Sequence, residues 1–86
     1  MMIRCNICVK LNNDDYYYDI LKKNIRKYRM LKKLTQQQLA DLTFLSVDYI
    51  CEIESLKKKK SFSIVTLGRI AYVLVIDIRE FFDKSV

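Results

Sequence analysis

Apolar residues recur along most of this chain at the three- and four-residue spacing that places them on one face of an α-helix. They form such stripes in five segments. The positions are Leu21, Ile25, Tyr28 and Leu31; Leu39 and Ala40; Ile50 and Ile53; Ile64, Leu67, Ile70, Ala71 and Leu74; and Ile78, Phe81 and Phe82. We therefore expect an all-α domain of five helices over residues 19–83.

The central stretch of residues 34–54 contains two helix starts in close succession. Thr35 is a favourable N-cap, and Gln38 three residues later completes a capping box. Ser46, eleven residues after Thr35, is a second N-cap. An apolar residue precedes each cap and can pack on another at the fourth helical position; these pairs are Leu34 with Leu39 and Leu45 with Ile50. Two short helices joined by a tight corner are typical of a helix-turn-helix.

The C-terminal part of the chain contains two further helix starts. Ser63 is an N-cap, and Asp77 with Glu80 has the spacing of a second capping box. The run of residues 70–78 is rich in β-branched side chains and by propensity alone would suit a strand. The cap at Asp77 indicates instead a turn near Val75 and a short final helix.

The first residues follow a different pattern. Over residues 2–12 apolar and polar side chains alternate with a period of two, which is typical of a strand. A single strand in a helical domain has no partner for its backbone groups. Two interpretations stay open, namely pairing with the same strand of a second subunit and a frayed tail. A linker over residues 12–19 follows, so the chain divides into an N-terminal arm, 1–18, and a helix-turn-helix domain, 19–86.

The net charge of +6 is unevenly distributed. Seven basic residues and no acidic residue lie between positions 22 and 33. A second cluster directly follows the second helix of the motif and consists of Lys57, Lys58, Lys59 and Lys60. Basic clusters on both sides of a helix-turn-helix favour a phosphate-binding surface over the alternative of a solvated helix face and a solubilising loop.

The composition argues against several other classes of protein. The chain has no histidine, the usual general base near neutral pH, and its ten carboxylates show no pairing, so we do not expect an enzyme. Cys5 and Cys8 form a CxxC, but zinc needs about four ligands and only Cys51 remains, so we expect no metal and no other cofactor. An odd number of cysteines suits a reducing compartment. With no signal peptide and no long apolar segment, we expect a cytoplasmic protein without membrane association.

One set of residues resembles a known family. Its members are Arg29, Leu34, Thr35, Gln36, Leu39, Ala40, Ser46, Ile50, Ile53, Glu54, Thr66, Leu67, Ile70, Ala71, Leu74, Ile76, Phe81 and Phe82. Their spacing is similar to that of the Cro/cI-type (lambda-repressor-like, XRE-type) helix-turn-helix domains. The resemblance implies a five-helix domain that binds double-stranded DNA through its third helix in the major groove and regulates transcription, with repression the preferred role.

The resemblance also implies roles for individual residues. Gln36, with Gln37 exposed beside it, would meet the DNA backbone at the start of the second helix. The groove-facing positions of the third helix would be Ser46, Val47, Asp48 and Glu52, with Tyr49 beside them. Arg29 and Glu54 would form an ion pair that joins the first helix to the end of the third.

The chain departs from the family at its corners. Glycine usually ends the first three helices there, where the backbone turns left-handed. Here those positions are occupied by Lys33, Phe44 and Leu56, and each left-handed residue other than glycine costs about 1–2 kcal/mol. Exposed apolar residues, namely Phe44, Leu56 and Val47, keep a second function open, a protein-interaction module of the same fold such as an antitoxin-like partner-binding protein.

A DNA-binding role also implies a dimer, because half-sites about one helical turn apart are read by two-fold symmetric proteins. Two seams are candidates for a homodimer. One is the N-terminal strand, and the other is the final helix with Ile78, Phe81 and Phe82.

Overall fold

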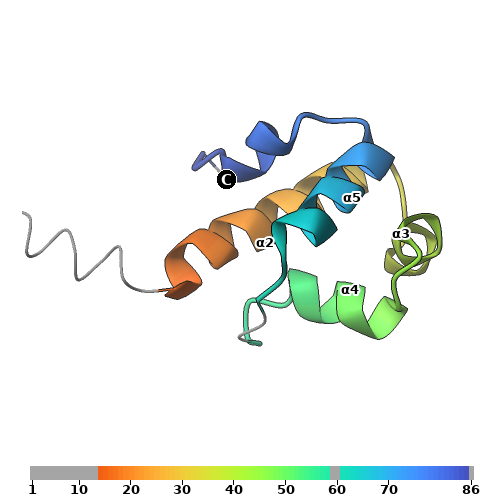
Figure 1. Ribbon diagram of the computed structural model, residues 1–86, viewed down its shortest axis with the longest axis horizontal. Coiled ribbons are helices and arrows are strands. Elements are labelled where there is room, and N and C mark those ends of the chain that lie inside the picture. Colours follow the sequence, from red (N-terminus) through yellow and green to blue (C-terminus); the bar gives the residue numbers. More distant parts are fainter. Residues whose placement is uncertain (1–13, 59–60, 86) are drawn as a thin grey trace, which may run out of the picture.

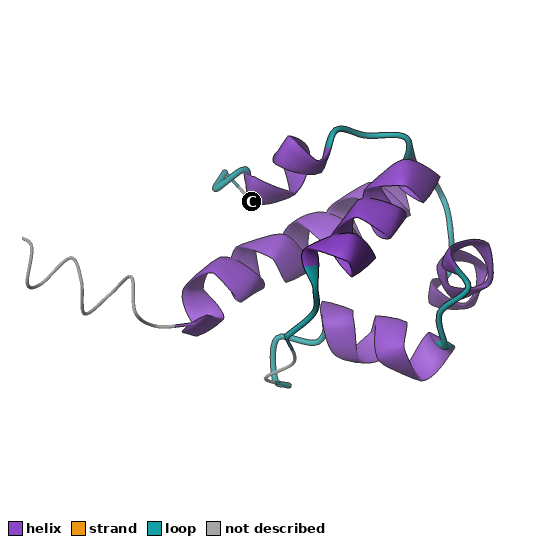
Figure 2. Ribbon diagram, in the orientation of Figure 1, coloured by secondary structure: helices purple, strands orange, loops and turns teal. Residues whose placement is uncertain are grey.

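The structure is a computed structural model that describes residues 14–58 and 61–85 (Figure 1). This part of the chain is all-α, as predicted, and Figure 2 shows helices and loops but no strand in it. The helices are α2 (Asp14–Leu31), α3 (Gln36–Thr43), α4 (Val47–Glu54) and α5 (Ile64–Leu74), followed by the 3₁₀-helix η1 (Ile78–Phe82). The strand expected over residues 2–12, with Cys5 and Cys8, lies outside the described residues. Among the helices that are described, none has both the length and the apolar character needed to cross a membrane.

The long helix α2 runs through the middle of the molecule, and in Figure 1 η1 lies above it, α5 crosses in front of its second half and α4 lies below. It begins at Asp14, so the linker expected over residues 12–19 is wrong from residue 14 onward. Packing extends the helix, because Tyr18 stacks edge-on against Phe62 with ring centroids 5.1 Å apart, and its hydroxyl donates to the Phe62 carbonyl at 3.4 Å. Propensity alone could not reveal a contact between residues so distant in sequence.

The helix-turn-helix is formed by α3 and α4, and its caps are those predicted. The Thr35 hydroxyl accepts from the Gln38 backbone N–H, and the Gln38 side chain accepts from the Thr35 N–H, which completes the capping box. The Ser46 hydroxyl accepts from the Tyr49 N–H at 3.1 Å. The inner faces of both helices are apolar and fully buried, and they consist of Leu39, Ala40, Ile50 and Ile53.

A single core joins α2, α5 and η1 to this motif, and most of the predicted stripe residues lie in it. Two predicted positions are wrong, since Leu31 is 64% exposed and Ile64 is 65% exposed. Both lie at helix ends, one as the last residue of α2 and one as the first of α5, where no neighbouring helix covers them. The β-branched run is helical as far as Leu74 and turns at Val75, as predicted.

The start of η1 differs from the capping box predicted there. The Asp77 carboxylate accepts from the Arg79 N–H and from its guanidinium, both at 2.9 Å, and this interaction lowers the pKa of the Asp77 carboxyl. Glu80 does not complete the box, because its carboxylate accepts from the Tyr28 hydroxyl at 3.2 Å. Phe81 is fully buried and packs near the ring of Tyr28.

Asn24 of α2 holds the C-terminal segment in place. Its side chain is fully buried, and its amide nitrogen donates to the carbonyls of Phe81 at 2.8 Å and Asp83 at 2.9 Å. The bond to Phe81 is buried and satisfies a backbone acceptor inside the protein, and the bond to Asp83 is partly buried. The side-chain oxygen of Asn24 has no partner, which is the cost of this arrangement.

Three corners of the chain adopt the left-handed conformation without glycine. They are Lys33 (φ 59°), Phe44 (φ 61°) and Val75 (φ 57°). Two of these were expected, but the prediction for Leu56 is wrong, because α4 ends at Ser55 in an extended conformation. The third corner falls instead at Val75, after α5.

The three corners share one geometry that offsets part of their strain. The residue after each corner donates its N–H to the carbonyl five residues before it; these bonds are Leu34 to Arg29 at 3.1 Å, Leu45 to Ala40 at 3.0 Å and Ile76 to Ala71 at 3.1 Å. This is the long bond of a Schellman motif. The donor residues Leu34, Leu45 and Ile76 also pack against the core. Each one closes a helix with its backbone and anchors the next helix with its side chain.

Arg29 and Glu54 form a buried ion pair between α2 and α4. The guanidinium Nε lies 2.7 Å from Glu54 Oε2, and Nη2 lies 2.9 Å from Oε1. A third bond, from Nη1 to the Leu34 carbonyl at 2.7 Å, holds the corner between α2 and α3. The two side chains are only 10% and 2% exposed, so the charges depend on each other.

Val75→Gly should stabilise the protein by about 0.5–1 kcal/mol. The substitution removes a left-handed strain of about 1–2 kcal/mol and adds unfolded-state entropy of about 0.5–1 kcal/mol. Val75 is 78% exposed, so little packing is lost with it. Val65→Gly is the matched control, because Val65 is 67% exposed in the first turn of α5 and its loss should destabilise by about 0.5 kcal/mol. Urea unfolding measures the free energy of unfolding of the two variants. If this free energy changes in the same direction in both, Val75 is not strained.

Glu54→Gln should destabilise the fold by about 3–5 kcal/mol, because it keeps the shape of the side chain but leaves the buried Arg29 charge without a counter-charge. Glu80→Gln is the control, since Glu80 is exposed and its hydrogen bond to Tyr28 is worth at most about 1 kcal/mol. Urea unfolding at neutral pH compares the two. Equal losses would show that the ion pair does not hold α4 in place.

Candidate nucleic-acid interface

The candidate interface consists of α4, the N-terminal end of α3 and the loop after α4. Figure 1 shows α4 and this loop together at one edge of the molecule, with α3 beside them. The capping bonds at Thr35 and Ser46 fix where both helices begin. The core residues Ile50 and Ile53 fix which face of α4 points inward.

The predicted groove-facing residues of α4 do not all point the same way. Asp48 is exposed and Glu52 is half-buried. The Ser46 hydroxyl is already used as the N-cap. Val47 and Tyr49, expected to face outward, pack partly against the core and keep only an edge at the surface. The outward face of α4 is therefore mainly carboxylate, which is an acceptor surface when ionised.

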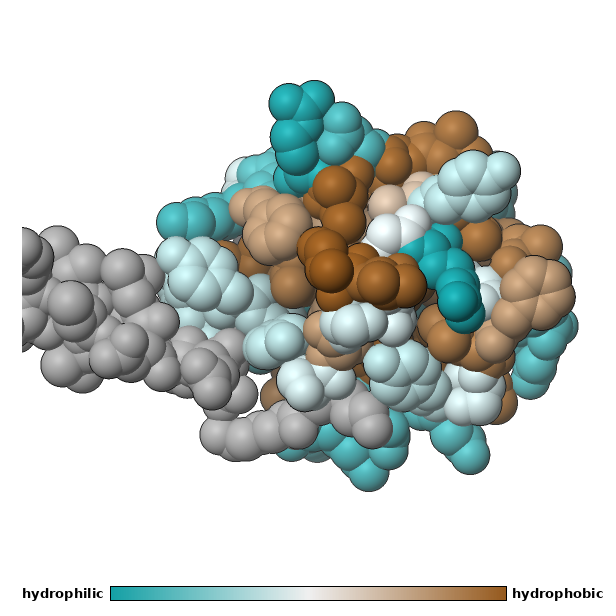
Figure 3. Space-filling view, viewed as in Figure 1, coloured by the Kyte–Doolittle hydropathy of each residue, from teal (hydrophilic) through white to brown (hydrophobic). Residues whose placement is uncertain are grey.

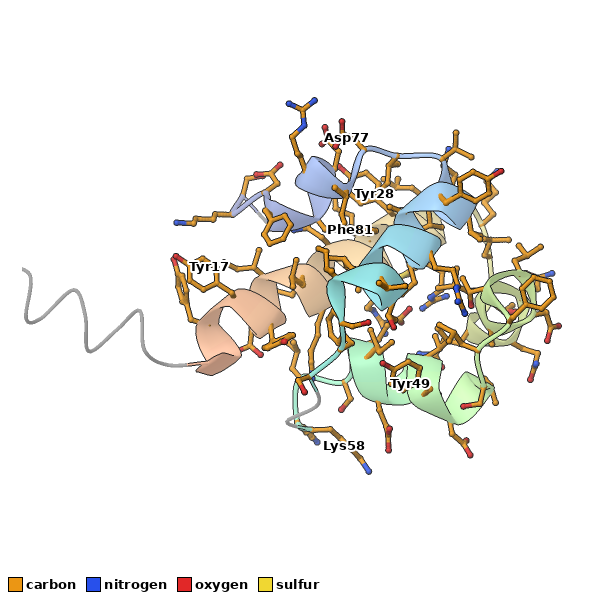
Figure 4. All side chains as sticks on the ribbon, in the orientation of Figure 1. Tyr17, Tyr28, Tyr49, Lys58, Asp77 and Phe81 are labelled. Carbon is orange, nitrogen blue, oxygen red and sulfur yellow. The ribbon has the colours of Figure 1, made fainter. Side chains whose placement is uncertain are left out.

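An open depression of about 420 Å³ lies along this face. It is lined by Asp48, Cys51, Glu52, Ser55 and Lys58. Two carboxylates on the helix and one lysine on the loop thus share the same surface. Figure 4 shows Lys58 on the loop at the lower edge and Tyr49 on α4.

Gln36 lies at the start of α3, but its side chain is turned toward the motif's interior. Its amide nitrogen donates to Glu54 Oε1 at 3.1 Å, and its oxygen accepts from the Cys51 thiol at 3.0 Å. A phosphate contact at this position would therefore rely on the helix N-terminus and its backbone amides. Gln37 is exposed and donates to the Asp41 carboxylate at 2.9 Å, one turn along α3.

The predicted basic clusters contain both exposed and buried side chains, which the sequence alone did not distinguish. Lys57 and Lys58 are exposed on the loop, and Lys59 and Lys60 lie outside the described residues. In the run on α2, Lys22 is only 2% exposed, so it is not part of the exposed basic face of that helix. Its ammonium donates to the Ser55 carbonyl at 2.9 Å and to the carbonyl of Lys58. This buried lysine therefore fixes the loop onto α2.

Sequence reasoning missed Lys22, although one signal was available. Lys22 precedes Arg29 by seven residues, which is two helical turns, so both lie on the same face of α2. Because Arg29 was assigned to the interior, Lys22 should have been assigned to the interior as well. Arg69 was also missed: its guanidinium on α5 donates to the Thr43 carbonyl at 3.3 Å and closes the end of α3 next to the corner at Phe44.

No group of three His, Cys, Asp or Glu side chains among residues 14–58 and 61–85 is placed to hold a metal ion. Cys51 is a free, exposed thiol.

Known proteins of the same fold are found among solved structures. No protein-family model and no curated protein matches the chain. The restriction-modification controller protein C.AhdI from Aeromonas hydrophila is 29% identical, with a TM-score of 0.69, and the alignment covers 76% of this chain and 96% of that protein.

Two further solved structures share the fold. The clp gene regulator ClgR from C. glutamicum is 23% identical over 76% of this chain and 82% of its own, with a TM-score of 0.69. The hypothetical transcription factor NHTF from Neisseria is 21% identical over 78% of this chain and 75% of its own, with a TM-score of 0.71. The helix caps and the buried core residues agree with this likeness. The chain therefore carries a helix-turn-helix domain of the Cro/cI type, with the lambda-repressor-like all-α fold.

Proposed function

We propose that this protein binds double-stranded DNA sequence-specifically and regulates transcription as a repressor, with α4 in the major groove. The observation that carries the proposal is the pairing of α4, held by its cap and by Glu54, with a cationic loop at the same edge of the molecule. A helix positioned by the core reads bases, and lysines beside it neutralise phosphates. The likeness to a controller protein, a gene regulator and a hypothetical transcription factor supports a role in regulation.

The acidic face of α4 gives the proposed base reading an unusual character. Ionised carboxylates only accept hydrogen bonds, and the best donor in the major groove is the cytosine amino group, with that of adenine second. Asp48 and Glu52 are the residues proposed to make these bonds, and the exposed edge of Val47 would meet a thymine methyl. Lys58 lines the same depression, and its positive charge would offset part of the repulsion between these carboxylates and the DNA phosphates.

We further propose that the protein acts as a homodimer, through either the N-terminal strand or the C-terminal segment. Phe81 is fully buried, so it cannot belong to the second seam as first expected. Phe82 is 44% exposed and lines a shallow depression together with Ile64. Figure 3 shows apolar side chains gathered over the start of α5 and the adjoining η1.

The second candidate function, a protein-interaction module, is favoured by a different surface. A groove of about 710 Å³ lies between the ends of α3 and α5 and is lined mostly by apolar residues, among them Leu42, Tyr72 and Val75. Tyr72 of this groove is 85% exposed. Phe44, which follows Leu42 by two residues in the chain, is 89% exposed. DNA binding that depends steeply on salt would favour the first function, and weak binding with a flat dependence would favour the module.

Lys57→Ala combined with Lys58→Ala should weaken binding to every duplex sequence by a similar factor. Each lost phosphate contact lowers the slope of log affinity against log salt by about 0.9, so the slope should fall by about two units. Affinity for a random duplex, measured by fluorescence anisotropy across a salt series, tests this. The proposed phosphate contacts are wrong if the loss is confined to one base position.

Glu52→Gln should tighten non-specific binding and shift preference toward adenine at one base pair in each half-site. The substitution keeps the shape of the side chain, removes a charge that phosphates repel and adds a donor. Asp41→Asn is the control, because it makes the same charge change at an exposed position on α3. Selection of bound sequences from a random pool measures both variants. If Glu52→Gln leaves every base preference as in the control, Glu52 does not read bases.

Removal of residues 1–12 should lower the dimer population if the strand forms the seam, whereas Phe82→Asp should lower it if the C-terminal segment does. A charge in an apolar interface loses its solvation without gaining a partner. Sedimentation velocity over a concentration series separates the two seams. A chain that stays monomeric at all concentrations would rule out both.

A further inference from the structure

A second cavity, of about 340 Å³, lies between α2 and the loop that follows α4. It is separate from the depression on the acidic face of α4, and only Ser55 lines both. Its lining residues are Lys22, Lys23, Arg26, Glu54, Ser55, Leu56 and Lys57.

The charge of this lining is strongly positive. Four of its seven residues are cationic and one is acidic. The acidic residue, Glu54, already accepts two bonds from Arg29 and one from Gln36, so its charge is largely compensated. No other carboxylate lines the cavity to balance the lysines and the arginine. An anion that enters would therefore meet a field set by the cations.

Lys22 gives the cavity a fixed wall. A buried ammonium usually has a carboxylate partner, but the Lys22 ammonium donates to the backbone carbonyls of Ser55 and Lys58. These bonds hold the loop at a set distance from α2. Lys23 and Arg26 are exposed on the helix side, and Lys57 is exposed on the loop side. Cations thus face each other across a gap whose width is set by buried bonds.

We infer that this cavity is an anion site that takes one phosphate group. The Arg26 guanidinium offers a planar pair of donors that matches two phosphate oxygens, and the ammonium groups of Lys23 and Lys57 supply further charge. The phosphate comes either from a DNA backbone at the edge of the loop or from a free small molecule. The first source rests on the proposed function and the second does not.

The DNA source is tested with the variant Lys23→Gln/Arg26→Gln. Because the cavity takes a single phosphate, the slope of log affinity against log salt should fall by about one unit and not two. Adding Lys57→Ala should lower the slope little further, since the same contact is already lost. The matched control is Lys27→Gln/Lys84→Gln, which removes the same charge from two residues that do not line the cavity; Lys27 lies over the ring of Tyr28 and Lys84 over that of Tyr16.

Binding of a free phosphate is tested by thermal unfolding of the full chain in increasing concentrations of inorganic phosphate at constant ionic strength. Ligand binding to the folded state raises Tm with concentration. Phosphate also stabilises proteins by exclusion from their surfaces, so the difference between the cavity variant and the control variant is the measure.

Each outcome decides the inference. A slope that falls only in the cavity variant supports it with DNA as the source. An unchanged slope with a Tm rise lost only in the cavity variant supports it with a free phosphate. If the cavity and control variants behave alike in both measurements, the anion site is overturned. If the natural chain binds no duplex at all, the proposed function fails, and the phosphate titration still decides the cavity.

Discussion

The arrangement of the helix-turn-helix depends on one cation, the guanidinium of Arg29. It binds the carboxylate of Glu54 on α4 and the Leu34 carbonyl in the corner before α3, and Glu54 in turn accepts from Gln36 on α3. Three helices therefore meet at one set of charge-assisted bonds. Such bonds have narrow preferences for distance and angle, which apolar packing does not. The orientation of α4 relative to α2 follows from this pair, with the core supplying most of the free energy.

Buried polar groups position other segments along the whole of α2. This helix carries three buried polar side chains, and each one binds a different segment. Lys22 binds the loop after α4, Asn24 binds the chain around η1, and Arg29 binds α4. Between them lie the apolar residues Leu21 and Ile25, which face the core. A helix that buries three polar groups depends on all of their partners, because any partner that is lost leaves a desolvated group behind. The long helix thus specifies the arrangement of the fold as well as its stability.

Those parts of the fold that depend on local chemistry could be predicted from the sequence. The caps at Thr35 and Ser46 act between residues three apart, so their geometry is contained in the motif itself. Parts that depend on distant contacts could not. The end of α4 avoids a left-handed corner at Leu56 because Lys22, 33 residues away in sequence, supplies a donor to Ser55. The early start of α2 depends in the same way on Phe62, which lies far along the chain.

The candidate site shows the same division. Charge and spacing predicted a set of residues for DNA contact, but they could not reveal which polar side chains form bonds inside the protein, as those of Gln36 and Lys22 do.

The left-handed corners have a consequence for how much of this protein a cell would contain. Phe44 and Val75 project into solvent, so their side chains contribute little to the core, yet at a net cost of about 0.5–1 kcal/mol relative to glycine each lowers the ratio of folded to unfolded chains by roughly two- to fivefold. Proteases remove unfolded chains continuously, so steady-state abundance follows this ratio. The rate at which the protein is degraded therefore depends in part on corners that lie outside α4. If the protein occupies its target in proportion to its concentration, these corners also influence that occupancy.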